Sequence, residues 1–139
     1  MMKTKMHSIC RMVKSEDLNH HGTLFAGKTA MWVVEAGFIA AASLTHPENI
    51  VCINVHGMLF KKPVQNGQII RLESKVVMAA RTRLVSYVKV LDNISDLLCL
   101  DGFLTFVHVD LQGKPLPHGI VLEYTDPEDI ALLEKAKAL

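Results

Sequence analysis

Apolar and polar residues alternate along four long segments in the second half of the chain. In the segment 68–78, apolar and charged side chains take turns over most of its length. A period of two is typical of β-strands, whose successive side chains point to opposite faces of a sheet. The pattern predicts strands at 51–59, 68–78, 83–91 and 97–109, and a shorter mixed segment, 6–13, predicts a first strand. Short polar links such as 91–96 imply that successive strands are antiparallel neighbours.

A different pattern fills residues 27–46, GKTAMWVVEAGFIAAASLTH. The segment is rich in alanine, contains no proline before position 47, and carries apolar residues on every side of a helical wheel. A helix that is hydrophobic all round must be buried all round. We therefore expect a long central helix that the strands enclose. Glu35 is the one acidic residue within its apolar run, from Ala30 to Leu44.

The C-terminal segment, DPEDIALLEKAKAL, has the signals of a second helix. Asp126 is placed to cap its first turn, and Pro127 follows at the first helical position. Acidic residues come early in the segment and Lys135 and Lys137 come late, which suits the helix dipole.

The order of these elements predicts an α+β protein. One antiparallel sheet of about five strands, wrapped around the long central helix, satisfies the order and is the hotdog fold. The alternative is a general α+β domain whose helix lies on one face of a sheet. No linker or internal repeat divides the chain, so we expect residues 1–139 to form a single hotdog domain.

The charge balance and the cysteine content limit the kinds of partner and site that we expect. The chain has 15 basic and 14 acidic residues, a balance that does not favour nucleic acid or an acidic membrane surface as partner. The three cysteines form no CxxC pair and the seven histidines no metal-binding spacing, so we expect no metal and no disulfide. The N-terminal residues do not have the pattern of a signal peptide. These observations favour a cytoplasmic protein.

Several motifs resemble one family. The segment NHHGTLFAGKTAMWVVEAG resembles the signature of the acyl-CoA hydrolase branch of hotdog thioesterases, which includes brain-type cytosolic acyl-CoA hydrolases and bacterial single-domain relatives. The segments FKKPVQNGQIIRLESKVV, ARTRLVSYVKV and FLTFVHVDLQGKPLP resemble further motifs of that branch. The likeness extends in register from about residue 11 to about residue 118.

The resemblance implies hydrolysis of acyl-CoA thioesters to free acid and CoA. It implies a homodimer, stacked into a trimer of dimers, because each site takes residues from two subunits. No cofactor is implied, since CoA is part of the substrate. The chain departs from the family at the catalytic Asp, whose position is Val34 here, while Glu35 matches the Glu that follows. Ala26 replaces the first glycine of the family's Gly-Gly pair, and Arg83 replaces the Ser after Arg-Thr.

Three residues are the candidates for catalysis: Asn19, Gly27 and Glu35. Asn19 is expected to orient water or the thioester carbonyl, or else to form an Asx turn in the loop. Gly27 lets the carbonyl approach the helix N-terminus, or simply permits a sharp turn before the helix. Glu35 either activates water or forms a structural pair with a His or Arg. A carboxylate at position 35 points about 100° away from position 34, so it does not simply replace the family's Asp.

Other residues are candidates for binding substrate. His20 and His21 are possible general bases, although loop histidines are more often solvated. Arg81 is expected to hold CoA phosphates, with a solvated sheet edge as the alternative, which we prefer for Lys61. The substrate-binding candidates are His20, Gly22, Thr23, Leu24, Phe25, Lys62, Arg81 and Thr82.

Three functions therefore compete. The first is an acyl-CoA thioesterase in which Glu35 or a loop histidine activates water. The second is a non-catalytic protein that binds acyl-CoA or CoA and has lost turnover through Val34. The third is another hotdog enzyme such as a hydratase, but the His-Asp or His-Glu pair of such enzymes is not evident.

Overall fold

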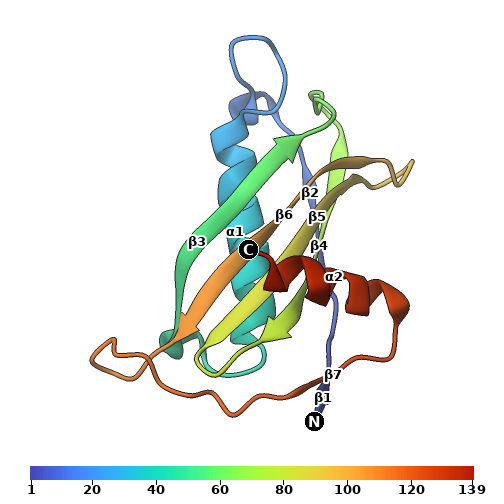
Figure 1. Cartoon of the computed structure of the whole chain (residues 1–139). Coiled ribbons are helices and arrows are strands. Elements are labelled where there is room, and N and C mark those ends of the chain that lie inside the picture. The colour runs from blue at the N-terminus through green and yellow to red at the C-terminus, as the bar shows by residue number, and fades with distance from the viewer.

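A computed structural model describes all residues, 1–139, and shows one five-stranded sheet with a helix on each face (Figure 1). In chain order the elements are β1 (Met2–Lys3), β2 (His7–Met12), the 3₁₀ helix η1 (Ser15–Asp17), α1 (Ala26–Ala42), the 3₁₀ helix η2 (Pro47–Asn49), β3 (Ile50–Phe60), β4 (Ile69–Ala79), β5 (Arg83–Asp92), β6 (Leu98–His108), β7 (Leu122–Glu123) and α2 (Pro127–Lys137). The five long strands and both α-helices confirm the predicted elements. The short parallel pair of β1 with β7 was not anticipated.

The sheet has the strand order β2-β4-β5-β6-β3, and every neighbouring pair is antiparallel. The rule that short links join neighbours is confirmed for β4, β5 and β6, which follow one another as hairpins. It is wrong for β3 and β4, which lie on opposite sides of β5 and β6. The link 61–68 instead crosses the N-terminal end of α1, where Leu24 N donates to Val64 O at 2.8 Å.

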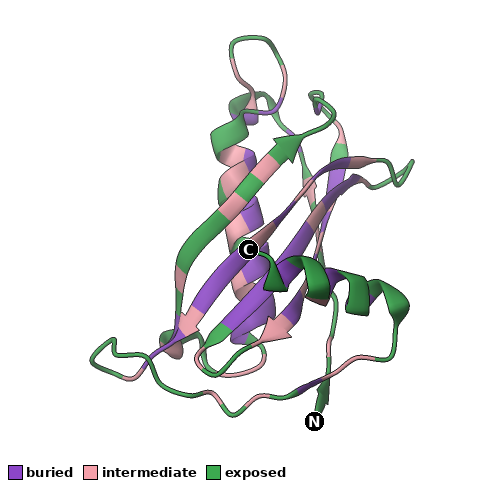
Figure 2. Cartoon of the chain, viewed as in Figure 1, coloured by how far each residue is buried: buried purple, intermediate pink, exposed green.

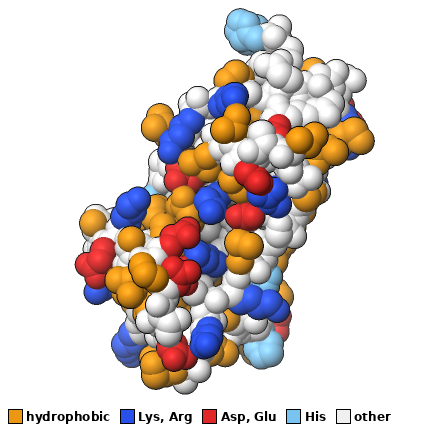
Figure 3. Space-filling view, turned by 90° about the vertical axis from the view of Figure 1, so that its right-hand side faces the viewer, with side chains coloured by type: hydrophobic (Ala, Val, Ile, Leu, Met, Phe, Trp, Pro, Cys, Tyr) orange, Lys and Arg blue, Asp and Glu red, His pale blue; other side chains and the backbone are white.

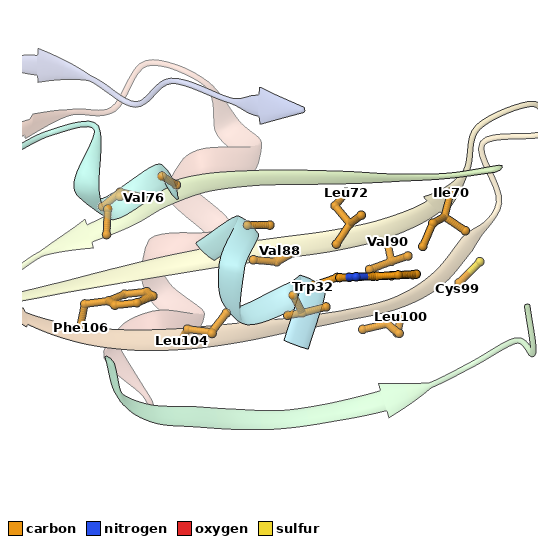
Figure 4. Packing of buried hydrophobic residues seen from close by; sticks show 14 of the residues in the cluster. Trp32, Ile70, Leu72, Val76, Val88, Val90, Cys99, Leu100, Leu104 and Phe106 are labelled. Atoms are coloured by element: carbon orange, nitrogen blue, oxygen red, sulfur yellow. The ribbon is translucent and has the colours of Figure 1, made fainter. Parts of the chain in front are cut away.

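Helix α1 packs along one face of the sheet. Its inward side carries Trp32, Val33, Ala36 and Ala40, all buried, and they meet strand residues in a core of 20 buried side chains. Figure 4 shows Trp32 pointing from α1 into this layer, near Val90 and Leu100.

The prediction that α1 is buried on every side is wrong for the single chain. Met31 on the outward side is 55% exposed, and Glu35 is exposed as well. Figure 2 shows α1 purple toward the sheet and pink or green away from it. The physical reason is that a five-stranded sheet from one chain covers only one side of a helix. The outward stripe of α1, which includes Met31 and Glu35, is therefore only partly covered by this chain.

Helix α2 lies on the opposite face of the sheet. Asp126 caps it as predicted, because its Oδ1 accepts from Glu128 N at 2.9 Å. Leu132 and Ala136 pack on a second, smaller core that includes Val77. An ion pair between Lys75 of β4 and Asp129 of α2 also ties the helix to the sheet.

Candidate functional site

The loop before α1 is held in shape by Asn19. Its Oδ1 accepts from His21 N at 2.8 Å and from Thr23 N at 3.2 Å, so the side chain forms the Asx turn considered above. Its Nδ2 donates to the Thr23 hydroxyl at 3.0 Å. Gly22 has a φ of +80°, which glycine adopts without strain. The loop therefore has a defined shape before any ligand arrives.

The first turn of α1 offers two free backbone donors. Phe25 N donates to Asp17 O, while Lys28 N and Thr29 N both donate to Phe25 O. The N–H groups of Ala26 and Gly27 have no acceptor within the protein, and no side chain caps this end of the helix. Unpaired N–H groups at a helix N-terminus, with the positive end of the helix dipole, attract a carbonyl or an anion.

Gly27 lies directly against the aromatic ring of Phe25. A Cβ atom at Gly27 would lie 2.6 Å from Cε2 of Phe25, closer than carbon atoms can approach. A larger residue at position 27 would therefore displace the exposed ring of Phe25 from the helix.

A hollow of about 310 Å³ opens beside this helix end. It is bounded by the loop, the first turn of α1, the end of β3 and the link 61–64. Its lining residues are Asn19, Thr23, Leu24, Ala26, Thr29, Phe60, Lys61, Lys62, Pro63, Val64 and Leu100. Four of the candidates from the sequence, Asn19, Thr23, Leu24 and Lys62, thus meet in one place, while Thr29 and Phe60 were missed.

The two lysines at this hollow differ in their surroundings. Lys61 Nζ lies 3.7 Å from Asp101 Oδ1, so part of its charge is balanced. Lys62 forms no ion pair with any carboxylate of the chain, and its side chain is exposed. Lys62 is therefore free to bind an anion at the rim.

Three more loop candidates, His20, Gly22 and Phe25, are exposed next to the hollow but do not line it. The rings of His20 and His21 lie against each other, with centroids 4.0 Å apart. Both imidazoles are therefore accessible to water near the entrance.

Arg81 and Thr82 lie far from the hollow. They follow the end of β4, whereas the link that lines the hollow leads into its start. A strand of 11 residues spans roughly 35 Å, so the two sites are at opposite ends of the sheet. Within one chain, Arg81 and Asn19 do not meet.

Glu35 is also outside the hollow. It lies nine residues after Ala26, roughly 13 Å along the helix axis. Its Oε1 is 2.5 Å from Nη2 of Arg11 on β2, and the guanidinium of Arg11 also lies 5.0 Å from the ring centroid of Trp32. Val34, in contrast, is half-buried against the core.

One buried charged group near the site was missed by the sequence analysis. Asp17, at the end of η1, is only 3% exposed. Its Oδ2 accepts from Lys14 N at 3.0 Å, and its Oδ1 lies 3.4 Å from Nζ of Lys28. The backbone hydrogen bond from Lys14, followed by the nearby Lys28 ammonium, lowers the pKa of Asp17 against the opposing effect of burial. Nothing in the periodicity of the sequence marks this pair.

The remainder of the molecule adds three observations. No group of three or more His, Cys, Asp and Glu side chains is arranged to hold a metal ion. None of the helices has the length and apolar character that a membrane span requires. Figure 3 shows Lys and Arg side chains interspersed with Asp and Glu on the face at the right of Figure 1.

Comparison with known proteins extends these observations. The family model of the thioesterase superfamily matches residues 21–99. YkhA of Bacillus subtilis, described as an uncharacterized acyl-CoA thioester hydrolase, is 31% identical over 116 residues, which are 81% of this chain and 67% of YkhA.

Two solved structures are similar over nearly the whole chain. An acyl-CoA hydrolase from Staphylococcus aureus, solved with butyryl-CoA, CoA and CoA disulfide, is 25% identical with a TM-score of 0.83, over 96% of this chain and 80% of that one. A hexameric acyl-CoA thioesterase, solved without ligand, is 29% identical with a TM-score of 0.85, over 96% of this chain and 86% of the other. With its fold and its matching family model, the chain belongs to the hotdog-fold thioesterase superfamily, in the branch of the acyl-CoA hydrolases.

Proposed function

We propose that this protein hydrolyses acyl-CoA thioesters to a free acid and CoA. The observation that carries the proposal is the hollow at the N-terminus of α1, which Asn19 and Ala26 line. The backbone N–H of Ala26 is unpaired, as is that of Gly27, which is the next residue but does not itself line the hollow. The names of its relatives, which are acyl-CoA hydrolases, point to the same substrate class. The reaction needs only water as co-reactant, so we propose no cofactor, and we propose the cytoplasm as its location.

The N–H groups of Ala26 and Gly27 would receive the thioester carbonyl oxygen. When water attacks the carbonyl carbon, a C–O bond forms and negative charge develops on that oxygen, which the two donors and the helix dipole stabilise. The C–S bond then breaks and CoA leaves as the thiol after gaining a proton. Asn19 holds the loop against the helix, and its remaining N–H is available to water or the carbonyl.

Lys62 would contact the phosphates of CoA at the rim of the hollow, because its ammonium is unpaired and exposed. We also propose that Arg81 and Thr82 contact CoA. Because they lie at the far end of the sheet, they reach a site only from a second copy of the chain.

The exposed edge of the sheet offers a binding surface for a second copy of the chain. Strand β3 is an edge strand with exposed apolar side chains, among them Val51, Ile53 and Val55. Pairing of β3 with its copy would cover these residues and extend the sheet, and would also bring a partner beside the exposed stripe of α1. The hexameric state of a similar thioesterase agrees with such pairing. We therefore propose a homodimer, assembled into a trimer of dimers.

Glu35 and the loop histidines are the two candidates for the general base that activates water. Glu35 is paired with Arg11 on the β2 side of α1, which supports its structural role. His20 and His21 are exposed beside the site, which supports a histidine as general base. We propose a loop histidine as the base and keep Glu35 as the candidate to be tested against it.

Val34 favours a second function, the binding of acyl-CoA or CoA without turnover. The position where the family carries its catalytic Asp holds an apolar side chain here. The hollow, the free N–H groups and Lys62 would all still bind the ligand. This alternative predicts affinity for CoA without release of free thiol.

Release of CoA thiol from a panel of acyl-CoAs tests the proposal. We expect turnover that falls at least tenfold in Asn19→Ala, because the loop that shapes the site loses its turn. Asn49→Ala is the matched control, since Asn49 bonds Val109 O at the opposite end of the helix. Absence of turnover by the wild-type protein, with CoA still bound in calorimetry, would establish the binding function instead.

A further inference from the structure

The proposed reaction does not use the ion pair between buried Asp17 and partly exposed Lys28. Asp17 is almost completely removed from water, and its Oδ1 lies 3.4 Å from Nζ of Lys28, a residue in the first turn of α1. The backbone of Asp17 takes part as well, since its carbonyl accepts from Phe25 N at 2.9 Å. Side chain and main chain of one residue thus hold the helix end that carries the free donors.

A negative charge in this position opposes the stabilisation of an oxyanion at the site. The N–H groups of Ala26 and Gly27 stabilise a developing oxyanion only if the local potential is positive. Asp17 is held beside this helix end by the hydrogen bond from Phe25 N to its carbonyl. Its carboxylate therefore lowers that potential, and burial makes the effect stronger because water screens the charge less. Asp17 stays ionised, since the Lys14 N–H and the Lys28 ammonium keep its pKa below the usual value.

The ammonium of Lys28 offsets the negative charge of Asp17. Its ammonium is on the third residue of α1, one position after Gly27, and faces the buried oxygen of Asp17. A cation at a helix N-terminus is unfavourable for the helix dipole, so the position of Lys28 is explained by the carboxylate it meets. Together the two side chains add no net charge beside the donors.

We propose that Asp17 and Lys28 are coupled positioning residues of the thioester site. Asp17 fixes the first turn of α1 to η1, and Lys28 cancels the charge of Asp17 at the N–H groups that receive the thioester carbonyl. This inference rests on the proposed function and assigns a role to a pair that makes no contact with the reacting atoms.

The two residues should respond unequally to substitution. Lys28→Met leaves the carboxylate uncompensated, and we expect kcat to fall about tenfold with a smaller change in KM. Asp17→Asn keeps an oxygen that accepts from Lys14 N and removes the charge, so kcat should stay within about threefold of wild type. Lys28→Arg retains the cation and should retain activity.

The double variant is decisive. Asp17→Asn combined with Lys28→Met has no uncompensated charge, so it should recover kcat to the level of Asp17→Asn alone. A pair that only stabilises the fold would give the opposite result, with the double variant no more active than Lys28→Met. Urea unfolding of all variants separates loss of stability from loss of rate.

A neighbouring ion pair is the matched control. Lys14 and Glu16 lie next to Asp17, with Nζ and Oε1 3.7 Å apart, and both side chains are exposed. Lys14→Met keeps the backbone N–H that bonds Asp17 and should leave kcat unchanged. A loss of kcat in Lys14→Met equal to that in Lys28→Met would overturn the proposal.

A binding experiment separates this inference from the proposed hydrolysis. The ligand is a ketone analogue of acyl-CoA, in which a methylene replaces the thioester sulfur and the carbonyl remains. A wild type that does not hydrolyse acyl-CoA would contradict the proposed function. In that case, weaker binding of the analogue by Lys28→Met, with wild-type affinity restored in the double variant, would still support the positioning role of Asp17 and Lys28. If all variants bind the analogue with equal affinity, and have equal kcat where turnover exists, the positioning role of Asp17 and Lys28 is overturned.

Discussion

The carboxylate of Glu35 on α1 and the guanidinium of Arg11 on β2 form an ion pair, with Oε1 and Nη2 2.5 Å apart. This pair places Glu35 on the side of the helix that faces the β2 edge of the sheet. Phe38, three residues later, is turned toward β6, the strand next to β3, where its ring packs edge-on against Phe106. Val34, one turn before Phe38, shares that side. Adjacent positions 34 and 35 therefore point about 100° apart, with Glu35 toward β2 and Val34 on the side of α1 that carries Phe38.

Glu35→Gln should leave turnover almost unchanged. The substitution removes the ion pair with Arg11, and since both side chains are partly exposed it should cost about 0–1 kcal/mol of unfolding free energy. We expect kcat within twofold of wild type in the thiol-release assay. A loss of a hundredfold or more would return Glu35 to the catalytic role and would exclude the loop histidines as the sole base.

Val34→Asp should increase turnover. It restores a carboxylate on the side of α1 that carries Phe38, where we place the partner subunit. A general base contributes about 10²–10⁴-fold in enzymes. We expect a gain in kcat of at least tenfold, despite a stability cost of about 1–3 kcal/mol for a half-buried polar group. Val34→Asn is the matched control, because it has the same shape as the Asp without the charge. Equal kcat in both variants would contradict the prediction.

Local features of this fold could be read from the sequence. The strands show a two-residue period, the Asp126 cap lies directly before Pro127, and the Asx turn of Asn19 involves residues only two and four positions away. Each of these depends on short-range geometry, which the order of residues specifies.

Long-range relationships could not be read in the same way. The separation of β3 from β4 depends on which strand edges meet after folding, and the Glu35–Arg11 and Asp17–Lys28 pairs depend on how loops and helix dock. The exposed stripe of α1 depends on how far one sheet reaches around the helix. An apolar helix has the same sequence pattern whether its own sheet or a second subunit covers it.

Lys62 and Lys61 should differ in their effect on CoA recognition. Lys62→Met removes the unpaired ammonium at the rim, and we expect KM for acyl-CoA to rise about five- to tenfold with little change in kcat. Lys61→Met should change KM less than twofold, because Lys61 is already paired with Asp101.

Acyl-pantetheine, which lacks the nucleotide and its phosphates, distinguishes phosphate binding from packing in this experiment. Lys62→Met should have the wild-type KM for this shorter substrate. A rise in KM for both substrates would show that Lys62 shapes the hollow rather than binding phosphate.

Charged residues on β3 should dissociate the protein. Ile53→Lys combined with Val55→Lys introduces two charges on the exposed edge strand, where lysine opposes pairing with another strand. We expect the mass in sedimentation equilibrium to fall to that of one chain, with loss of turnover because Arg81 can then no longer reach the site. Ile94→Lys, in the exposed β5–β6 turn at 87% exposure, is the control and should leave the assembly intact.

The carboxyl group of Asp92 should make the free energy of unfolding depend on pH in the acidic range. Its Oδ1 accepts from Ile94 N and Ser95 N, and its Oδ2 accepts from Gln68 Nε2. The hydrogen bond from Ser95 N, followed by the one from Ile94 N, lowers the pKa of Asp92 from its ordinary value of 3.8. A carboxyl group with a lowered folded-state pKa stabilises the protein above its unfolded pKa, and this contribution is lost as pH falls through the folded value.

Urea unfolding between pH 7 and pH 2 measures this contribution. The wild type should be more stable than Asp92→Asn at pH 7, and the difference should begin to shrink as pH falls to about 4 and continue to shrink below it, because the protonated carboxyl no longer gains from the turn amides. Glu48→Gln, which removes an exposed carboxylate that has no ion pair, is the control variant measured over the same range. A constant difference for Asp92→Asn over the same range would mean that the turn does not favour the ionised carboxylate.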